Sequence, residues 1–207
     1  MPKRRWLKRE LVIERAAEMA DETGSAADVS LTALAQALNI RTPSLYNHVA
    51  NLDDLHYGLA VFGVRQLLAE LRQAAQGLVG EEAVLAMATT YRQFAHDHPG
   101  LYPLTVRAPD PEHIELTALS EEFVQFLLLI MSSMGLQGND AVHAIRGLRA
   151  VLHGFVSLEA AGGYKMLLDK EESFSRLVAA YISGVQPQAS EGKFQLATEK
   201  MTASSSR

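Results

Sequence analysis

Apolar side chains recur along most of this chain at the three- and four-residue spacing of amphipathic helices, and strand-like alternation is absent. In the first such segment, Val12 and Ala16 share one face, whereas Glu10 and Glu14 occupy the other. Gly24 should end this helix, because glycine adopts the left-handed conformation without strain. The pattern predicts an all-α fold.

Two short helices joined by a tight turn should follow the first helix. Ser30 has the side chain of an N-cap for the first of them, and residues 39–40 make the turn. Thr42 and Pro43 supply the cap and first helical position of the second, which should span residues 44–48. This arrangement is typical of a helix-turn-helix.

A long helix should begin near Asn51 and run to about residue 76, connecting a small N-terminal part to a larger C-terminal one. Further helices are expected at about 81–97, 111–135, 139–161 and 171–185, with a short one at 100–106. We therefore expect a small helix-turn-helix domain over residues 1–51, a larger helical domain over 52–186, and a flexible tail over 187–207.

Composition narrows the class of protein. The 207 residues are 48% hydrophobic, which suffices for a real core, and they include no cysteine, which excludes disulfides and thiolate metal sites. The longest apolar run, residues 126–131, is far shorter than the ~20 residues that a membrane span needs. The charged N-terminus lacks the apolar region of a signal peptide. We expect a cytoplasmic protein with no membrane partner.

Charge is distributed unevenly within the net charge of −5. Residues 1–51 carry seven basic and six acidic residues, whereas the remainder carries twelve and eighteen, so the two parts are +1 and −6. Five of the basic residues lie within residues 3–9. Such a cluster is typical of a solvated terminus; the alternative is that Lys3, Arg4 and Arg5 form an arm across DNA phosphates or the minor groove.

The predicted turn leaves one polar surface facing outward. Leu34, Leu38, Leu45 and Val49 should pack inward. The residues left outside are Arg41, Thr42, Pro43, Ser44, Tyr46, Asn47 and His48. A short, polar and nearly uncharged helix of this kind suits the major groove of DNA, where side chains meet base edges.

Three stretches resemble the DNA-binding signature of the TetR repressor family. They are Leu34-Ala35 through Leu38-Asn39-Ile40, Thr42-Pro43-Ser44-Leu45-Tyr46-Asn47-His48-Val49 and Asn51-Leu52-Asp53-Asp54-Leu55. The resemblance implies that Tyr46, His48 and Thr32 bind backbone phosphates. It also implies that the recognition helix touches bases or phosphates through Arg41, Thr42, Pro43, Ser44 and Asn47.

The signature is not complete, and single residues have simpler roles open to them. Asn39 replaces a usual glycine but also tolerates positive φ. Leu52 stands where a lysine commonly contacts phosphate, which should lower the salt slope of DNA binding by about one. Thr42 and Asn51 could act only as helix caps, and Tyr46 as a half-buried aromatic residue.

Two apolar stripes near the C-terminus predict a homodimer interface. One contains Ile145, Leu148, Leu152, Phe155 and Glu159, and the other Phe174, Leu177, Val178, Tyr181, Ile182 and Val185. Paired with their copies, the two helices would form a four-helix interface. The alternative is that both stripes belong to the core of one chain. Residues 148–159 also resemble the His-Gly motif of one class of TetR-type C-terminal domains, without the tryptophan usual before the histidine.

Aromatic and histidine side chains on the C-terminal helices are candidates for a small-molecule site. They are Phe62, Tyr91, Phe94, His98, Tyr102, Phe123, Phe126, Met131 and His153. Ordinary core packing is the competing interpretation for most of them. A metal site at His96-Asp97-His98 is not expected, because the i, i+2 spacing turns the two imidazoles to different sides of a helix. We expect no cofactor.

The sequence contains no phosphate-binding loop, nucleophile elbow, His-Glu-x-x-His motif or dinucleotide fingerprint, so catalysis is not expected. Together with the resemblance, these features predict a homodimeric repressor that a small-molecule effector releases from a palindromic double-stranded DNA operator. The alternatives are an activator of the same fold, a helical protein-interaction module whose DNA binding has decayed, and, last, an enzyme with a helical pocket.

Overall fold

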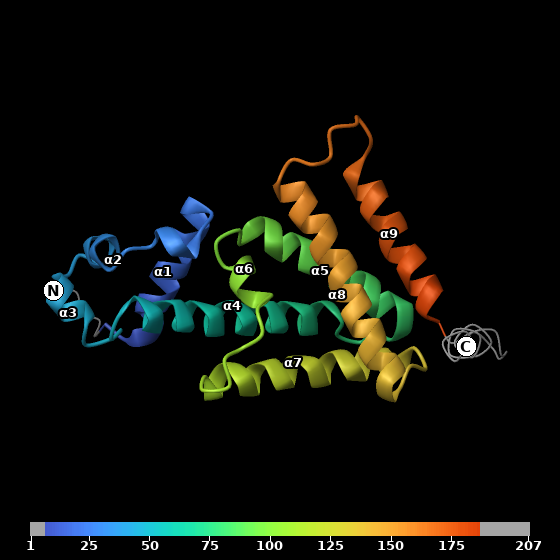
Figure 1. The fold of residues 1–207 in the computed structure, drawn as a ribbon, viewed down its shortest axis with the longest axis horizontal. Helices are drawn as coiled ribbons and strands as arrows, with labels where there is room; N and C mark the ends of the chain where they lie inside the picture. The colour runs from blue at the N-terminus through green and yellow to red at the C-terminus, as the bar shows by residue number, and fades with distance from the viewer. Residues whose placement is uncertain (1–6, 187–207) are drawn as a thin grey trace, which may run out of the picture.

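The chain folds into α-helices joined by short loops (Figure 1). The computed structural model describes residues 7–186, a range without any β-strand. The elements are α1 Arg9–Thr23, the 3-10 turn η1 Ala26–Asp28, α2 Leu31–Ala37, α3 Thr42–Leu45, α4 Leu52–Ala74, α5 Gly80–Asp97, α6 Tyr102–Thr105, α7 Ile114–Ser133, α8 Gly138–Ala160 and α9 Lys170–Val185. The all-α prediction is confirmed. The predictions for the basic arm at residues 3–5 and the tail at 187–207 lie outside the described residues.

Helices α1, α2 and α3 form a small bundle against the first turns of α4. Its core consists of apolar side chains that are at most 1% exposed: Val12, Ala16, Ala20, Leu34, Ala35, Leu45, Val49, Leu55 and Leu59. Figure 1 places this bundle at one end of an elongated molecule, opposite α8 and α9. The inward positions predicted for the turn at Leu34, Leu45 and Val49 are confirmed.

Local chemistry fixes the ends of α1 and α2 and the starts of α2 and α4 as predicted. Gly24 ends α1 at φ 77°, and Asn39 makes the turn after α2 at φ 53°. The Ser30 hydroxyl accepts from the Ala33 amide at 3.1 Å, and the Asn51 side chain accepts from the Asp54 amide at 2.8 Å. Each cap satisfies an amide that has no partner within its own helix.

The third helix differs from its prediction. It spans Thr42–Leu45, and residues 46–48 continue as turns. Its N-cap position is Arg41, whose backbone is extended and whose carbonyl accepts from the Ser44 amide at 2.8 Å. Thr42 is therefore the first helical residue and not the cap, and Pro43 is the second, where its missing N–H costs nothing.

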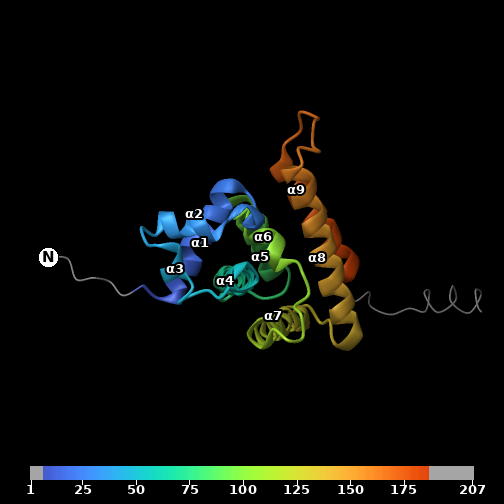
Figure 2. The same ribbon diagram turned by 60° about the vertical axis from the view of Figure 1, so that its left-hand side comes forward.

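Helix α4 connects the bundle to a second core. Its first turns bury Leu55 and Leu59 in the bundle, and its last turns bury Leu67 and Leu71 in the second core. Helix α5 packs on one side of α4 and α7 on another; α8 crosses α5 and α7, and α9 lies on α8 and α5 (Figures 1 and 2). None of the helices described between residues 7 and 186 is long and apolar enough to cross a membrane.

The apolar stripes of α8 and α9 face this second core, which corrects their assignment to a dimer interface. Leu148, Leu152, Phe155, Phe174, Val178 and Ile182 are each at most 5% exposed within a single chain. The Tyr181 hydroxyl donates to the Ala144 carbonyl at 2.5 Å, and Glu159 pairs with Arg92 of α5 at 2.9 Å. Leu177 alone of the predicted stripes stays exposed. Helices α5 and α7 cover the α8 stripe, and α5 and α8 cover the α9 stripe.

Candidate functional site

Residues 41–48 form a polar ridge at the end of the molecule that carries α3 (Figure 1). Its exposed members are Arg41, Pro43, Ser44, Tyr46 and Asn47, while Thr42 and His48 are half-buried. Tyr46 is 54% exposed, whereas its neighbour Leu45 is 1% exposed and anchors the segment in the bundle core. With 54% of its surface exposed, Tyr46 can contact a partner outside the chain. All seven side chains predicted to face outward reach solvent.

Thr32 is exposed one residue after the first position of α2, the helix that packs beside α3. Its own backbone amide belongs to the first turn, where amides lack helical partners. A hydroxyl and open amides at one helix start suit an anionic oxygen such as a phosphate. The structure thus brings Thr32 to the same small bundle as the polar ridge.

An ion pair that the sequence did not predict holds the end of the ridge. The Arg9 guanidinium donates to both carboxylate oxygens of Asp54, at 2.7 and 2.8 Å, and to the His48 carbonyl at 2.6 Å. Asp54 also accepts from the Ala50 amide at 2.8 Å. The hydrogen bonds from Arg9 hold the pKa of Asp54 below its usual value, against the opposing effect of burial.

This clamp changes the role of one residue in the basic cluster. The sequence places Arg9 in a basic cluster typical of a solvated terminus, but its side chain instead joins α1, the ridge and α4. No periodicity in the sequence indicates a pairing between residues 45 positions apart. Only the three-dimensional arrangement of the bundle brings Arg9 to Asp54.

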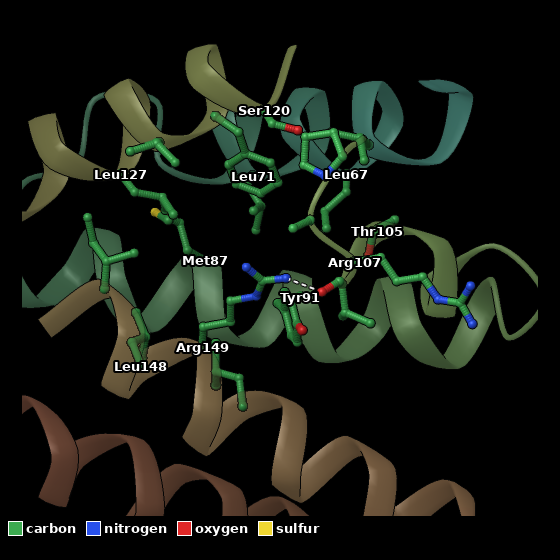
Figure 3. Close-up of a pocket in the computed structure, with 18 of the residues that line it drawn as sticks. Leu67, Leu71, Met87, Tyr91, Thr105, Arg107, Ser120, Leu127, Leu148 and Arg149 are labelled. Atoms are coloured by element: carbon green, nitrogen blue, oxygen red, sulfur yellow. Dashed lines mark hydrogen bonds between the residues drawn. The ribbon is translucent and has the colours of Figure 1, made fainter. Parts of the chain in front are cut away.

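A second feature is a cavity of about 280 Å³ between α4, α5, α7, α8 and the segment after α6 (Figure 3). Its lining is mainly apolar, with a few polar groups. The lining residues are Val64, Leu67, Leu71, Met87, Tyr91, Thr105, Val106, Arg107, Ala108, Pro109, Ser120, Phe123, Val124, Leu127, Met131, Ile145, Leu148, Arg149 and Leu152. An apolar cleft with few polar groups is the common form of a small-molecule site.

Three of the predicted ligand residues line this cavity: Tyr91, Phe123 and Met131. The other six do not, and each has another role. Phe62 packs against the N-terminal bundle, Phe94 is 1% exposed and lies 4.8 Å from the His98 ring, and Phe126 lies under the Arg72 guanidinium at 5.6 Å. These aromatic residues are core, because helical spacing alone does not show which face of a helix meets a void.

Tyr102 and His153 do not line the cavity but belong to a hydrogen-bonded chain that begins at Tyr91. The hydroxyls of Tyr91 and Tyr102 are 2.9 Å apart, and the Tyr102 hydroxyl lies 2.6 Å from His153 Nδ1. Burial raises the pKa of both tyrosines. The chain holds the Tyr91 ring at the cavity wall in a neutral state.

His98 links the bundle to the helices around the cavity. The Gln66 amide nitrogen lies 2.9 Å from His98 Nε2; because an amide nitrogen only donates, Nδ1 carries the ring proton and donates to Asp21 at 2.7 Å. Asp21 also accepts from the amides of Gly100 and Leu101, at 3.0 and 3.2 Å. Asp21 of α1 therefore caps the turn that leads into α6.

Gly100 is required at this junction. A Cβ on Gly100 would lie 2.1 Å from the Ala20 carbonyl oxygen, closer than any side chain can approach. The backbone before α6 is thus pressed directly against the end of α1. Six residues further on, Val106 already lines the cavity.

Sequence reasoning missed the polar residues of the cavity, namely Thr105, Arg107, Ser120 and Arg149. They occupy polar positions of amphipathic segments, where a solvated side chain is the normal expectation. In the part of the chain that the structure describes, no group of three or more His, Asp or Glu residues is placed to hold a metal ion. His96 pairs with the adjacent Asp97, while His98 points to Asp21.

Comparisons with known proteins agree with this architecture. Residues 84–181 match the family described as the Tetracyclin repressor-like, C-terminal domain. The chain is 33% identical to the HTH-type transcriptional regulator YobS of Bacillus subtilis over 186 residues, which cover 89% of this chain and 96% of YobS. It is also 33% identical to the HTH-type transcriptional regulator Rv0681 of Mycobacterium tuberculosis over 190 residues, covering 90% and 85% of the two chains.

Solved structures share the fold at lower identity. A protein of unknown function from Rhodococcus sp. RHA1 superposes with a TM-score of 0.73 at 22% identity, over 90% of this chain and 100% of that one. A variant of TetR from Acinetobacter baumannii AYE, solved in complex with minocycline, gives a TM-score of 0.62 at 21% identity, over 88% and 99%. On the strength of the two curated relatives and the matched C-terminal domain, this chain belongs to the TetR family of DNA-binding transcriptional regulators.

Proposed function

We propose that this regulator is a homodimeric repressor whose polar ridge reads operator DNA and whose cavity binds a small molecule that releases it. One observation carries the proposal. The short segment 98–109 contacts both the N-terminal bundle and the cavity: Asp21 of α1 holds its start, and its end lines the cavity. An occupant that displaces Val106 therefore pulls on the bundle that presents the ridge.

DNA recognition is assigned to residues 1–51, and ligand binding and dimerisation to residues 52–186. Within the ridge, Tyr46 and His48 contact phosphates, as does Thr32 on α2. Arg41, Thr42, Pro43, Ser44 and Asn47 meet bases or phosphates in the major groove. Their access to solvent supports these roles, because a side chain that reaches solvent from the bundle can also reach a groove.

The Acinetobacter TetR variant, which has this fold, was solved in complex with minocycline, and this supports a ligand-binding role for a protein of the same fold. The cavity here is bounded by both α4 and the segment after α6. A ligand changes DNA binding only through different affinities for the two conformations, typically by about 1–3 kcal/mol. Displacement of α4 and α6 together is the conformational change that this geometry supports.

Because the predicted stripes are buried, we assign the homodimer interface to the outer face of α8 and α9. It consists of small and apolar residues, Ala150, Gly154, Ser157 and Leu158 on α8 and Leu177, Ala180 and Gly184 on α9. A Cβ at Gly154 or Gly184 would meet nothing within 4 Å, so this face is open to a close approach of a second pair of helices. The loop between the two helices adds exposed Met166, Leu167 and Leu168.

Selection of bound DNA from a random pool tests the proposal. The expected result is a palindrome whose half-sites lie about 10 base pairs, or a multiple of that, apart, with transcription from a promoter carrying it decreased by the protein. Ala180→Glu should yield monomers in analytical ultracentrifugation and weaken binding to the palindrome. Sequence-independent binding would refute the proposal, and increased transcription would make the protein an activator.

A further inference from the structure

The charged side chains that line the cavity are all positive. Of its 19 lining residues, two are arginines, Arg107 and Arg149, and none is acidic. Within residues 7–186, neither arginine lies within ion-pair distance of a carboxylate, although most other arginines of this region do. A chain with an overall charge of −5 thus places unpaired positive charge at its apolar cavity.

The two arginines are directed differently. Figure 3 shows the Arg149 guanidinium turned toward the middle of the cavity, whereas the Arg107 side chain extends away from it. Arg149 donates one N–H to the Val106 carbonyl, which fixes the side chain while leaving other donors of the guanidinium unused. The positive charge of Arg149 also acts on Tyr91 at the cavity wall, because it lowers the pKa of Tyr91 whereas burial raises it.

The remaining polar groups of the wall are already engaged. The Thr105 hydroxyl donates to the Tyr102 carbonyl at 2.8 Å, and the Ser120 hydroxyl donates to the Leu116 carbonyl at 2.8 Å. The Tyr91 hydroxyl is bonded to Tyr102. A ligand that enters therefore meets apolar surface on most sides and one guanidinium with free donors, which pairs best with a carboxylate.

We infer that the effector of this cavity is an amphipathic organic anion, with an apolar body between α4, α5, α7 and α8 and a carboxylate on Arg149. The inference rests on the proposed function, in that it names the chemical class of that function's ligand. A carboxylate on Arg149 would also couple the cavity to the N-terminal bundle. A carboxylate that takes the guanidinium competes with the Val106 carbonyl, which belongs to the segment held at its other end by Asp21.

Three probes of one chain length test the inference: decanoate, decanol and decylammonium. Isothermal titration calorimetry on the full chain should show one site per chain, with decanoate binding at least about tenfold more tightly than decanol and decylammonium most weakly. Arg149→Gln should abolish the preference for decanoate over decanol. Arg149→Lys should keep most of it, because the charge remains.

Arg146→Gln is the matched control, since Arg146 is an exposed arginine of the same helix that does not line the cavity. It should leave the preference intact, and far-UV circular dichroism checks the fold of each variant. Equal binding of decanoate and decanol to the wild type, or a preference that survives Arg149→Gln, overturns the inference.

A parallel measurement of affinity for the selected DNA distinguishes the anion preference of the cavity from the proposed control of DNA binding by a ligand. If decanol weakens DNA binding as strongly as decanoate, ligand control stands and the anion preference falls. If decanoate binds through Arg149 without changing DNA affinity, the anion site stands and the proposed ligand control falls.

Discussion

The two ends of α4 differ in how their functional residues are held. At one end, the ridge is a single stretch of residues, 41–48, fixed by Leu45, Val49 and the Arg9–Asp54 pair and otherwise open to solvent. At the other end, the wall of the cavity comes from α4, α5, α7 and α8, from the last residue of α6 and from the loop after it. In the proposed function, DNA recognition therefore depends on a few exposed side chains, whereas ligand recognition depends on the shape and charge of a cavity that several helices enclose.

A charge placed on the ridge should produce the largest effect. Ser44→Glu puts a carboxylate where phosphates and base edges must approach, so affinity for the selected DNA should fall at least about 100-fold in fluorescence anisotropy. Gln73→Glu is the control, because it adds the same charge at an exposed position near the far end of α4. Equal losses in the two variants would mean that overall charge, and not the ridge, governs binding.

Loss of the clamp should act on the ridge through stability. Arg9→Met leaves the half-buried Asp54 carboxylate with the Ala50 amide alone and removes the Arg9 hydrogen bond to the His48 carbonyl, and we expect a loss of about 1–2 kcal/mol in urea unfolding. Arg15→Met is the comparison, because Arg15 pairs only with exposed Glu18 and Glu22 of its own helix. Arg15→Met should change stability little. A similar loss in both variants would show that the clamp is an ordinary surface pair.

A smaller effect should appear in the pH dependence of stability. Because the folded-state pKa of Asp54 lies below its unfolded value near 3.8, its contribution is fully present above that value and disappears as pH falls through the folded pKa. The difference in urea midpoint between the wild type and Asp54→Asn should therefore be constant from pH 7 to about 5 and shrink below about 4. A difference that grows on acidification would contradict the low pKa.

The sequence predicted the ridge well because its determinants are local. Ser30, Asn39 and Asn51 set the helix boundaries by their own chemistry, and Leu34, Leu45 and Val49 fix which side faces inward. The local errors were confined to one short helix: Thr42 is its first residue and not its cap, and it ends at Leu45 and not at residue 48. In short segments with strong helix caps, nearby residues determine the helix boundaries and the buried side, and distant contacts change them little.

The cavity could not be predicted in the same way. Phe94 and Phe123 have the same apolar character in sequence, yet only Phe123 meets the void, because the crossing of α7, α5 and α8 decides which face is covered. Arg149 looks like a solvated residue of an amphipathic helix until the loop after α6 is placed beside it. The burial of the α8 and α9 stripes follows from the same long-range packing.

Filling the cavity should by itself weaken DNA binding by the ridge, and a substitution can test this without knowledge of the effector. Ser120→Phe places a ring in the cavity from α7, whereas Ala118→Phe places the same ring on the exposed side of that helix. The decisive measurement is the affinity of each folded variant for the selected DNA. We expect Ser120→Phe to bind the selected DNA about tenfold more weakly than the wild type, and Ala118→Phe to bind it as tightly as the wild type. A filled cavity with unchanged DNA affinity would contradict it.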